Sequence, residues 1–467
     1  MTKEQPPHIL VLAAGTDDRM NTTLTKALQP VFFMPMIRYV LDAAMSVPHR
    51  SLAVVVGPGE RDLRERLRDY ESIQFIPVKP GIGGAGALLA AGEYLATLEG
   101  DILVLNGSAP LMSHRSIGGL WGRHRESGAD CTVATAAVAD PAGQARVITD
   151  SGSIKDLREE LDCSEAERRI TEIPAGIYAF GHQALLTGLR ALASAPLSRE
   201  RRLSETVKAL AAGGFSTTAW LVADPDEALD VADLHGVWRA ETILRERFNR
   251  ALMLKGVSLQ DPRTTVIDPR CRIERDVLIE GGVVLVNSVV EGAVKIESAC
   301  RIADSIIGRG TYIKQGTRID GSRVGKDCVL GPYAHLRPGC ALSDEVHVGN
   351  FVELKNSTVG LRTKISHLSY IGDAEIGRNV NVGCGFITCN YDGGPVKQRT
   401  VVEDGVFIGS DSQAIAPVRF GAGSFIATGT SVTDDVPPGG FAISRGRQVT
   451  KADYARKYGK KKASPGP

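Results

Sequence analysis

The chain has 467 residues, of which 43% are apolar, so it can build two or three globular domains with full cores. Its 55 basic and 54 acidic residues give a net charge of +1, which predicts no binding to nucleic acid or membrane through overall charge. The eight cysteines include no CxxC pair and no apolar run is long enough to span a bilayer, so we expect buried thiols and a cytoplasmic protein.

Apolar strands alternate with amphipathic, helix-length segments through the first half of the chain. This order predicts an α/β sheet of Rossmann type. Ligands of such sheets bind at the carboxyl ends of strands, so the loops at 13–20 and 106–110 are the expected binding loops. The predicted strands cover 8–14, 52–56, 102–105 and 131–138, and the predicted helices include a stretch from about 35, then 60–70 and 114–126.

Residues 233–256 have apolar positions at helical spacing, with no proline or glycine between Gly236 and Gly256. We interpret this stretch as a helix that connects the two halves of the chain.

Apolar residues recur at six-residue steps throughout the second half. The period fits neither a helix nor a hairpin sheet. Before residue 324 the series breaks into triplets, which gives a repeat of 17 residues. The longest runs are Val324, Leu330, Leu336, Leu342, Val348 and Leu354, then Ile408, Ala414, Phe420, Ile426 and Val432.

Three hexads can close one triangular coil of a parallel β-helix, with every sixth side chain pointing inward. One coil cannot bury its own apolar row, so stability must come from stacking, and residues 264–440 supply about ten coils. An ordinary β-sandwich with accidental spacing is the alternative, and so many steps in register disfavour it. The hand of the β-helix does not follow from the sequence.

Two sets of motifs resemble one enzyme family along nearly the whole chain. The first half carries Leu12-Ala13-Ala14-Gly15, then Arg19 and Lys26. The second half carries the segments 349–355 (GNFVELK), 367–373 (HLSYIGD) and 387–393 (ITCNYDG). Together they resemble the bifunctional N-acetylglucosamine-1-phosphate uridyltransferase / glucosamine-1-phosphate N-acetyltransferase family.

The resemblance implies an α/β + all-β fold class, in which a Rossmann-like nucleotidyltransferase domain precedes a left-handed parallel β-helix of hexapeptide repeats. It also implies a homotrimer and a place in the synthesis of UDP-N-acetylglucosamine for peptidoglycan. The expected segments are a nucleotidyltransferase-like domain at 1–232, a linker helix at 233–257, an acyltransferase domain at 258–450 and a disordered basic tail at 451–467.

By the resemblance, His367 is the general base that takes a proton from the 2-amino group of glucosamine 1-phosphate, and Glu353 orients or tunes it. A hydrogen-bonded structural histidine is the alternative. The implied sugar-phosphate ligands are Arg337, Lys355, Tyr370 and Asn381, for which the alternative is solvated surface charge at Arg337 and Lys355. The implied acetyl-CoA ligands are Cys384, Asn390, Tyr391, Ser410, Thr428 and Arg445.

Three positions on the β-helix depart from the family pattern, namely Cys384, Phe386 and Thr428. Phe386 is expected to reshape the acyl pocket if it lines that pocket. Cys384 could form a covalent acyl-enzyme, although a small buried thiol is the simpler interpretation.

The first half departs further from the family. The expected nucleotide ligands that remain are Leu12, Ala13, Ala14, Gly15, Arg19, Lys26 and Glu159. Ser108 and Ala232 stand where the family holds its metal, so no magnesium site is expected there. Asp17 and Asp18 would repel a triphosphate, or they could rebuild a displaced metal site.

We therefore expect an N-acetyltransferase that uses acetyl-CoA on an amino-sugar phosphate, with an inactive or altered uridyltransferase domain. The first alternative is a fully bifunctional enzyme that makes UDP-N-acetylglucosamine from glucosamine 1-phosphate, acetyl-CoA and UTP, and only this reading needs magnesium. The second alternative is a non-catalytic sugar-nucleotide sensor or scaffold.

Overall fold

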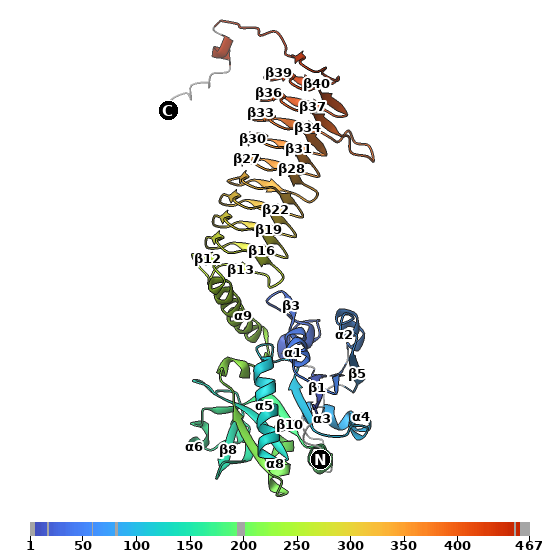
Figure 1. Cartoon of the computed structure of the whole chain (residues 1–467), viewed down its shortest axis with the longest axis vertical. Helices are drawn as coiled ribbons and strands as arrows, with labels where there is room; N and C mark the ends of the chain where they lie inside the picture. Colours follow the sequence, from blue (N-terminus) through green and yellow to red (C-terminus); the bar gives the residue numbers. More distant parts are fainter. Residues whose placement is uncertain are drawn as a thin grey trace, which may run out of the picture. The chain divides into compact units, whose positions relative to one another are not determined.

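The computed structural model describes residues 5–15, 18–57, 59–79, 83–193, 201–452 and 454–457. The chain divides into two compact units, residues 1–247 and 248–467. The first unit is built on a nine-stranded sheet in the order β5-β4-β1-β6-β10-β7-β11-β9-β8 (Figure 1). Its strands are β1 His8–Ala13, β4 Ser51–Val56, β5 Ile73–Pro77, β6 Ile102–Asn106, β7 Cys131–Ala137, β8 Arg146–Asp150, β9 Ser153–Arg158, β10 Glu172–Phe180 and β11 Thr217–Leu221.

Helices cover this sheet, and a two-stranded ribbon of β2 Pro30–Val31 and β3 Met34–Pro35 precedes the first of them. The α-helices are α1 Met36–Met45, α2 Glu60–Arg66, α3 Gly83–Ala90, α4 Gly92–Ala96, α5 His114–Ser127, α6 Glu165–Arg168, α7 His182–Ala193 and α8 Leu203–Ala212. The 3₁₀ turns are η1 Asp18–Met20, η2 Lys26–Leu28, η3 Glu160–Asp162 and η4 Pro225–Ala228.

Strand β1 contributes to two apolar cores, one on each face of the sheet, because successive side chains of a strand point to opposite sides. Ile9 and Val11 belong to one apolar core, while Leu10 belongs to the other. The first core contains residues of α1 and α5, and the second contains residues of α3, α7 and α8. The continuous apolar run at 8–14 therefore forms a strand that is buried on both faces, as predicted from the sequence.

Only part of the sheet is parallel. Strands β5, β4, β1 and β6 pair in parallel, whereas β10 lies antiparallel to both β6 and β7. The register of β10 shifts between Pro174 and Tyr178, and Gly176 within that bulge has a φ of 76°. Glycine tolerates this left-handed conformation, so the bulge can turn the backbone toward the carboxyl ends of β1 and β6.

Helix α9, Leu234–Leu254, lies within the stretch 233–256 that the sequence assigned to a connecting helix. Within the second unit its last turns close the beginning of the β-helix. The Asn249 side chain is fully buried and donates hydrogen bonds to the backbone carbonyls of Pro262 and Thr265, at 2.7 and 3.0 Å. Leu252 packs into the same apolar core as the coils.

The second unit is a parallel β-helix with three sheets of eleven, ten and nine short strands (Figure 1). The first sheet holds β12 Ser258–Leu259, β15 Leu278–Ile279, β18 Lys295–Ile296, β21 Tyr312–Ile313, β24 Val329–Leu330, β27 His347–Asn350, β30 Lys364–His367, β33 Asn381–Val382, β36 Phe407–Ile408, β39 Phe425–Ile426 and β41 Phe441–Ala442.

The other two sheets complete each coil. The second holds β13 Val266–Ile267, β16 Val284–Val286, β19 Arg301–Ala303, β22 Arg318–Asp320, β25 His335–Leu336, β28 Glu353–Lys355, β31 Tyr370–Gly372, β34 Ile387–Cys389, β37 Gln413–Ile415 and β40 Ser431–Val432. The third holds β14 Arg272–Ile273, β17 Val289–Val290, β20 Ile306–Ile307, β23 Arg323–Val324, β26 Ala341–Leu342, β29 Thr358–Val359, β32 Ala374–Ile376, β35 Thr400–Val402 and β38 Val418–Phe420.

The hexad residues form the core of the β-helix, as their spacing predicted. Leu330, Leu336 and Leu354 are fully buried, and Val324 and Leu342 are buried to within 4%. Parallel pairs such as Leu354 with Ile371 place equivalent residues of neighbouring coils on top of each other. Since each apolar row is covered only by the next coil, the core is continuous along the stack.

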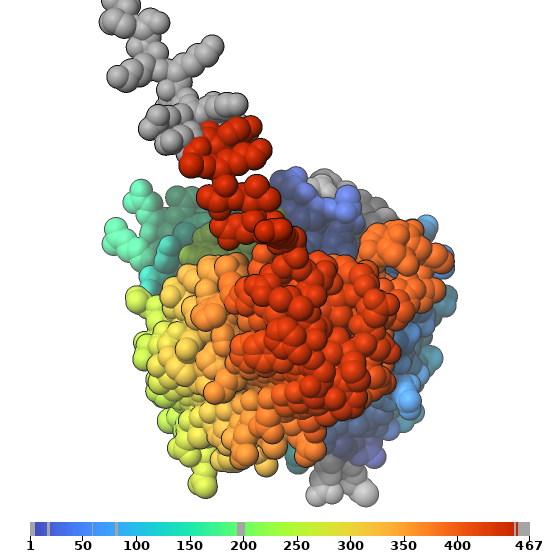
Figure 2. All heavy atoms as spheres, turned by 90° about the horizontal axis from the view of Figure 1, so that it is seen from above, coloured from blue at the N-terminus to red at the C-terminus, as the bar shows by residue number. Residues whose placement is uncertain are grey.

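One loop interrupts the coils, between β34 and β35. In Figures 1 and 2 this orange loop projects from the side of the coil stack. Within the described residues, no helix combines the length and apolar character needed to cross a membrane. Of the predicted basic tail, residues 453 and 458–467 lie outside the described part, and 454–457 form the 3₁₀ turn η5 Tyr454–Lys457.

Candidate functional site

His367 ends strand β30 and stands directly above Asn350, its partner at the end of β27. The imidazole Nδ1 lies 2.7 Å from the Asn350 side-chain oxygen, Oδ1. An amide oxygen can only accept a hydrogen bond, so Nδ1 carries the proton and the lone pair of the neutral ring is on Nε2. The exposed ring is thereby prepared to accept a proton from a ligand.

Glu353, which was expected to orient His367, hydrogen-bonds a different residue. Arg337 donates from Nη1 to Glu353 Oε1 at 2.9 Å, and this hydrogen bond raises the pKa of the Arg337 guanidinium. The residue that fixes His367 is Asn350, which the sequence analysis did not single out. Only the 17-residue spacing between 350 and 367 could have revealed that the two stack.

Three predicted sugar-phosphate ligands and Glu353 share the outward face of the second sheet. Glu353 pairs with Tyr370, and Lys355 pairs with Gly372, on adjacent coils. Arg337 lies one coil before Lys355, since its backbone nitrogen bonds the Leu354 carbonyl. Asn381 is different, because it lies on the first sheet between Lys364 and Phe407. The predicted sugar-phosphate ligands therefore occupy two neighbouring sheets rather than one.

Predicted acetyl-CoA ligands line one edge of the β-helix. Each of His367, Cys384, Ser410 and Thr428 stands two residues after a paired residue of the first sheet, so they occupy equivalent positions on successive coils. Arg445 continues this edge, since a Cβ on Gly429 would lie 3.6 Å from its Cδ. The edge forms a continuous track that begins at the candidate base.

A second edge holds a buried carboxylate that the sequence analysis also left unassigned. Asp373 accepts hydrogen bonds from Asn356 Nδ2 at 2.7 Å and Asn390 Nδ2 at 2.5 Å, and Lys355 Nζ lies 3.5 Å from it. Burial raises the pKa of Asp373, but the two amides and the lysine charge outweigh burial and the net shift is downward. Asp373 is therefore a carboxylate at neutral pH.

Gly372 leaves room for the side chains around this carboxylate. A Cβ at residue 372 would come within 2.4 Å of the Tyr370 hydroxyl and 2.6 Å of Asn390 Nδ2. Asn390 is buried, whereas the next residue, Tyr391, is exposed and has the Lys397 ammonium 4.4 Å from its ring centroid. The 387–393 motif therefore sends one side chain inward and the next outward.

Phe386 does not line an open pocket. Its side chain is fully buried in the β-helix core, with its ring 6.4 Å from that of Phe420. The expectation that Phe386 reshapes the acyl site is corrected by this packing, because residue 386 is one of the inward positions of its coil. Cys384, two residues earlier, is partly exposed on the edge beside His367.

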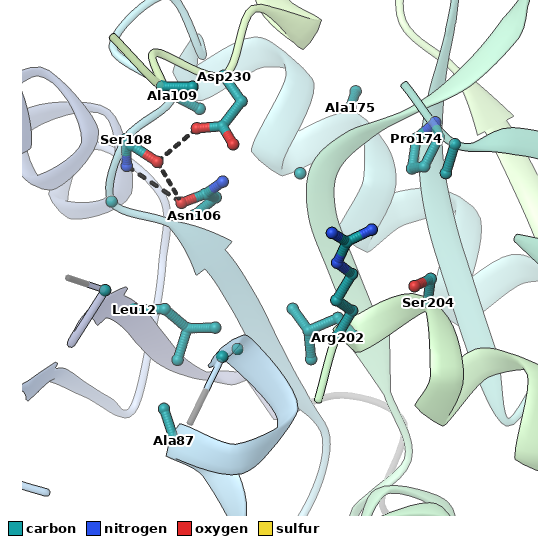
Figure 3. Close-up of a pocket in the computed structure, with 18 of the residues that line it drawn as sticks. Leu12, Ala87, Asn106, Ser108, Ala109, Pro174, Ala175, Arg202, Ser204 and Asp230 are labelled. Atoms are coloured by element: carbon teal, nitrogen blue, oxygen red, sulfur yellow. Dashed lines mark hydrogen bonds between the residues drawn. The ribbon is translucent and has the colours of Figure 1, made fainter. Parts of the chain in front are cut away.

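The first unit contains a cavity of about 590 Å³ at the carboxyl ends of β1 and β6 (Figure 3). All the predicted nucleotide ligands line it, from the β1 end, the following turn, and Glu159. The two substituted metal positions, Ser108 and Ala232, line it as well. The structure thus gathers these scattered residues into one cleft, which lies beyond the ends of β1 and β6 where the sequence predicted binding loops.

Ser108 is engaged in hydrogen bonds inside this cleft. Its hydroxyl lies 2.8 Å from Asn106 Oδ1 and 2.5 Å from Asp230 Oδ1 (Figure 3). A carboxylate thus enters the cleft from residue 230, which the sequence analysis did not assign. Glu159 accepts a hydrogen bond from Ser204 at 3.0 Å and forms an ion pair with Arg202.

The two positions at which the resemblance implies magnesium ligands carry no carboxylate. Mg²⁺ prefers carboxylate oxygens at short range, whereas a methyl group stands at 232 and a hydroxyl at 108. Among the residues that the structure describes, no three His, Cys, Asp or Glu side chains are grouped so as to hold a metal. Asp17 and the side chain of Asp18 lie outside the described part.

The fold and these two sites define a class of protein, in which a nucleotidyltransferase-type α/β unit is joined to a hexapeptide-repeat β-helix of acyltransferase type. Two family models agree with this class. The MobA-like NTP transferase domain matches residues 9–213, and the GMPPB C-terminal domain matches residues 260–343.

Relatives that match along nearly the whole chain identify the family. The chain is 38% identical over 464 residues to the bifunctional protein GlmU of Geobacillus sp. (strain WCH70), covering 98% of this chain and 99% of that protein. It is 40% identical over 459 residues to bifunctional GlmU of Pelobacter propionicus, covering 97% and 98%. For GlmU of Geotalea uraniireducens the values are 39% over 455 residues, with 96% and 98% covered.

The chain belongs to the bifunctional GlmU family, which confirms the resemblance drawn from its motifs. The predicted architecture, a Rossmann-like nucleotidyltransferase domain followed by a left-handed parallel β-helix, is confirmed with it.

Proposed function

We propose that the second unit is an acetyl-CoA-dependent N-acetyltransferase that acts on glucosamine 1-phosphate or a close amino-sugar phosphate. The observation that carries this proposal is the hydrogen bond between His367 and Asn350, which leaves Nε2 as a proton acceptor beside a sheet face with Arg337 and Lys355.

In the proposed reaction the sugar amine attacks the acetyl carbonyl of the thioester. The new N–C bond forms as the C–S bond breaks, His367 Nε2 takes the proton from the amine, and the coenzyme leaves as its thiol after protonation. Asn350 supports this role, because its oxygen also stabilises the positive charge that the imidazole gains.

Arg337 and Lys355 supply positive charge for the phosphate of the acceptor, and Tyr370 and Asn381 supply hydrogen bonds to the sugar. The edge formed by Cys384, Ser410, Thr428 and Arg445 is the proposed track for coenzyme A. Asn390 and Tyr391 lie at the acetyl end of the coenzyme in this proposal. Acetyl-CoA is thus a co-substrate in this proposal.

For the first unit we propose loss or strong alteration of uridyl transfer, because Ser108 and Ala232 offer no anionic oxygen to a metal. A second candidate is the fully bifunctional enzyme, and the relatives favour it over an inactive first unit, since each is called bifunctional and matches end to end. Arg19, Lys26 and Glu159 in the cleft agree with the bifunctional reading. Magnesium is required only in that reading.

One preparation of the full chain tests all readings. Thiol release from acetyl-CoA is followed with a panel of amino-sugar phosphates, and pyrophosphate release is followed with UTP, N-acetylglucosamine 1-phosphate and Mg²⁺. Thiol release alone supports the acetyltransferase with an altered first unit, and both products support the bifunctional enzyme. Ligand binding with neither product would support a sensor or scaffold and reject the proposal.

The homotrimer remains a prediction from the resemblance, and the cytoplasmic location remains a prediction from the cysteines and the short apolar runs. Light scattering of the purified chain measures the first. A monomer with full acetyltransferase activity would contradict a trimer whose subunits share a site.

A further inference from the structure

The second edge of the β-helix carries a column of side chains, one from each successive coil, and the residue types in this column differ beside the candidate site. By register, residues 287, 304, 321, 338, 356, 373 and 390 occupy one corner of successive coils. Gly321 and Pro338 fill two of these corners, so the fold itself requires no charge there. Beside the site the column becomes Asn356, Asp373 and Asn390, and Asp373 is only 8% exposed.

A carboxylate that is this well buried must be compensated by hydrogen bonds and positive charge, or it destabilises the protein. Asp373 has both, since an amide donates to it from the coil on each side and Lys355 faces it. A carboxylate offers no proton at neutral pH, so the amide of Asn390 must direct its NH₂ group toward Asp373 and its oxygen away. The orientation of Asn390 is therefore determined by Asp373.

We propose that Asp373 is a positioning residue of the acetyl-transfer site, and that it sets the Lys355 ammonium and the Asn390 amide in place for the two substrates. This inference rests on the proposed acetyltransferase function. Tyr370 shares the arrangement, because Asn390 Nδ2 also lies 3.5 Å from its hydroxyl and Gly372 leaves the space in which they meet. One buried charge would thus organise ligands on three successive coils.

The test compares Asp373→Asn with Asp304→Asn in the full-length protein. Asp304 occupies the same corner, has nearly the same φ (49° against 50°) and accepts a 2.6 Å hydrogen bond from Asn287, but it is exposed and lies on a coil away from the site. Both substitutions conserve volume and remove one charge at the same corner of a coil, so they differ in burial and in the neighbouring ligands.

We expect Asp373→Asn to lower kcat for acetyl transfer to glucosamine 1-phosphate at least tenfold and to weaken calorimetric binding of coenzyme A at least threefold. Asp304→Asn should leave both within twofold, with a similar change in Tm. A loss of kcat below threefold in Asp373→Asn, or an equal loss in Asp304→Asn, would overturn the inference.

Two further measurements keep the test decisive. If Asp373→Asn does not fold, Asn356→Ala replaces it, because Asn356 is exposed and its loss removes one donor to the carboxylate; a fall in kcat below twofold would then reject the role. If the wild type does not acetylate any amino-sugar phosphate, the proposed function fails, and the coenzyme A affinities of the variants alone decide whether Asp373 positions its neighbours.

Discussion

The two units hold their sites by different means. On the β-helix each candidate ligand has a position fixed by backbone pairing, as with Asn350 under His367 and Glu353 under Tyr370. In the α/β unit the cleft is assembled from strand ends and loops that are far apart in sequence, such as Ser108 and Asp230. The cleft gathers Arg19, Lys26 and Glu159, and it holds Ser108 and Ala232 at the positions where the resemblance implies a metal. On stacked coils the position of each candidate side chain is set by the pairing of its own coil, whereas in the cleft it depends on loops that tertiary contacts bring together.

The strongest test of this comparison is His367→Ala. Loss of a general base lowers the rate of such reactions about 10²–10⁴-fold, and we expect thiol release to fall by that factor. His335→Ala is the histidine control, since His335 lies one coil before Glu353 in the column that continues to Tyr370 and is not the candidate base, and its rate should stay within twofold. More than a tenth of wild-type activity in His367→Ala would contradict the mechanism.

Phe386→Ala should destabilise the β-helix by about 3–5 kcal/mol, the usual cost of truncating a buried phenylalanine. Urea unfolding followed by circular dichroism measures this change. Phe407→Ala is the control, since Phe407 is 40% exposed and stacks on Phe425 at the surface; it should cost less than half as much. If Phe386→Ala left the stability unchanged and altered the acyl-chain preference, Phe386 would line the acyl pocket and not the core.

Lys355→Met should raise KM for the sugar phosphate about 10–100-fold, because a charged hydrogen bond to the phosphate is lost. Initial rates of thiol release at saturating acetyl-CoA give this value. An exposed lysine at a turn of an earlier coil, Lys326, supplies the control Lys326→Met, for which KM should not change. Equal KM values for both variants would show that the phosphate binds elsewhere.

In the α/β unit, Ser108→Asp combined with Ala232→Asn should create oxygen ligands where the wild type has a hydroxyl and a methyl group. We expect calorimetry to show Mn²⁺ binding at least tenfold tighter than in the wild type. Tight Mn²⁺ binding by the wild type, together with pyrophosphate release, would remove the difference between the two units and establish the bifunctional reading.

The smallest expected effect belongs to Ser108→Ala. It removes the hydrogen bonds to Asn106 and Asp230 and alters only the first unit. Thiol release should remain within twofold of the wild type. A larger fall would mean that acetyl transfer depends on the state of the cleft.

Much of the α/β unit could be predicted from its apolar runs, because β1, β4, β6 and β7 are buried on both faces. The antiparallel part could not. Strand β10 contains proline and a glycine with positive φ, and it takes its place between β6 and β7 only through pairing with residues far along the chain. The Ser108–Asp230 contact depends on the same long-range pairing and carries no local signal.

The sequence by itself determined the β-helix, its core residues and the family, because a six-residue period and long motifs are local patterns that each coil repeats. Tertiary structure alone decided which polar side chains meet. His367 takes Asn350 as its partner, Glu353 takes Arg337, and Asp373 is enclosed by two amides and a lysine. These pairs lie about one coil apart, and a hydrogen bond depends on direction and distance that spacing in the sequence does not specify.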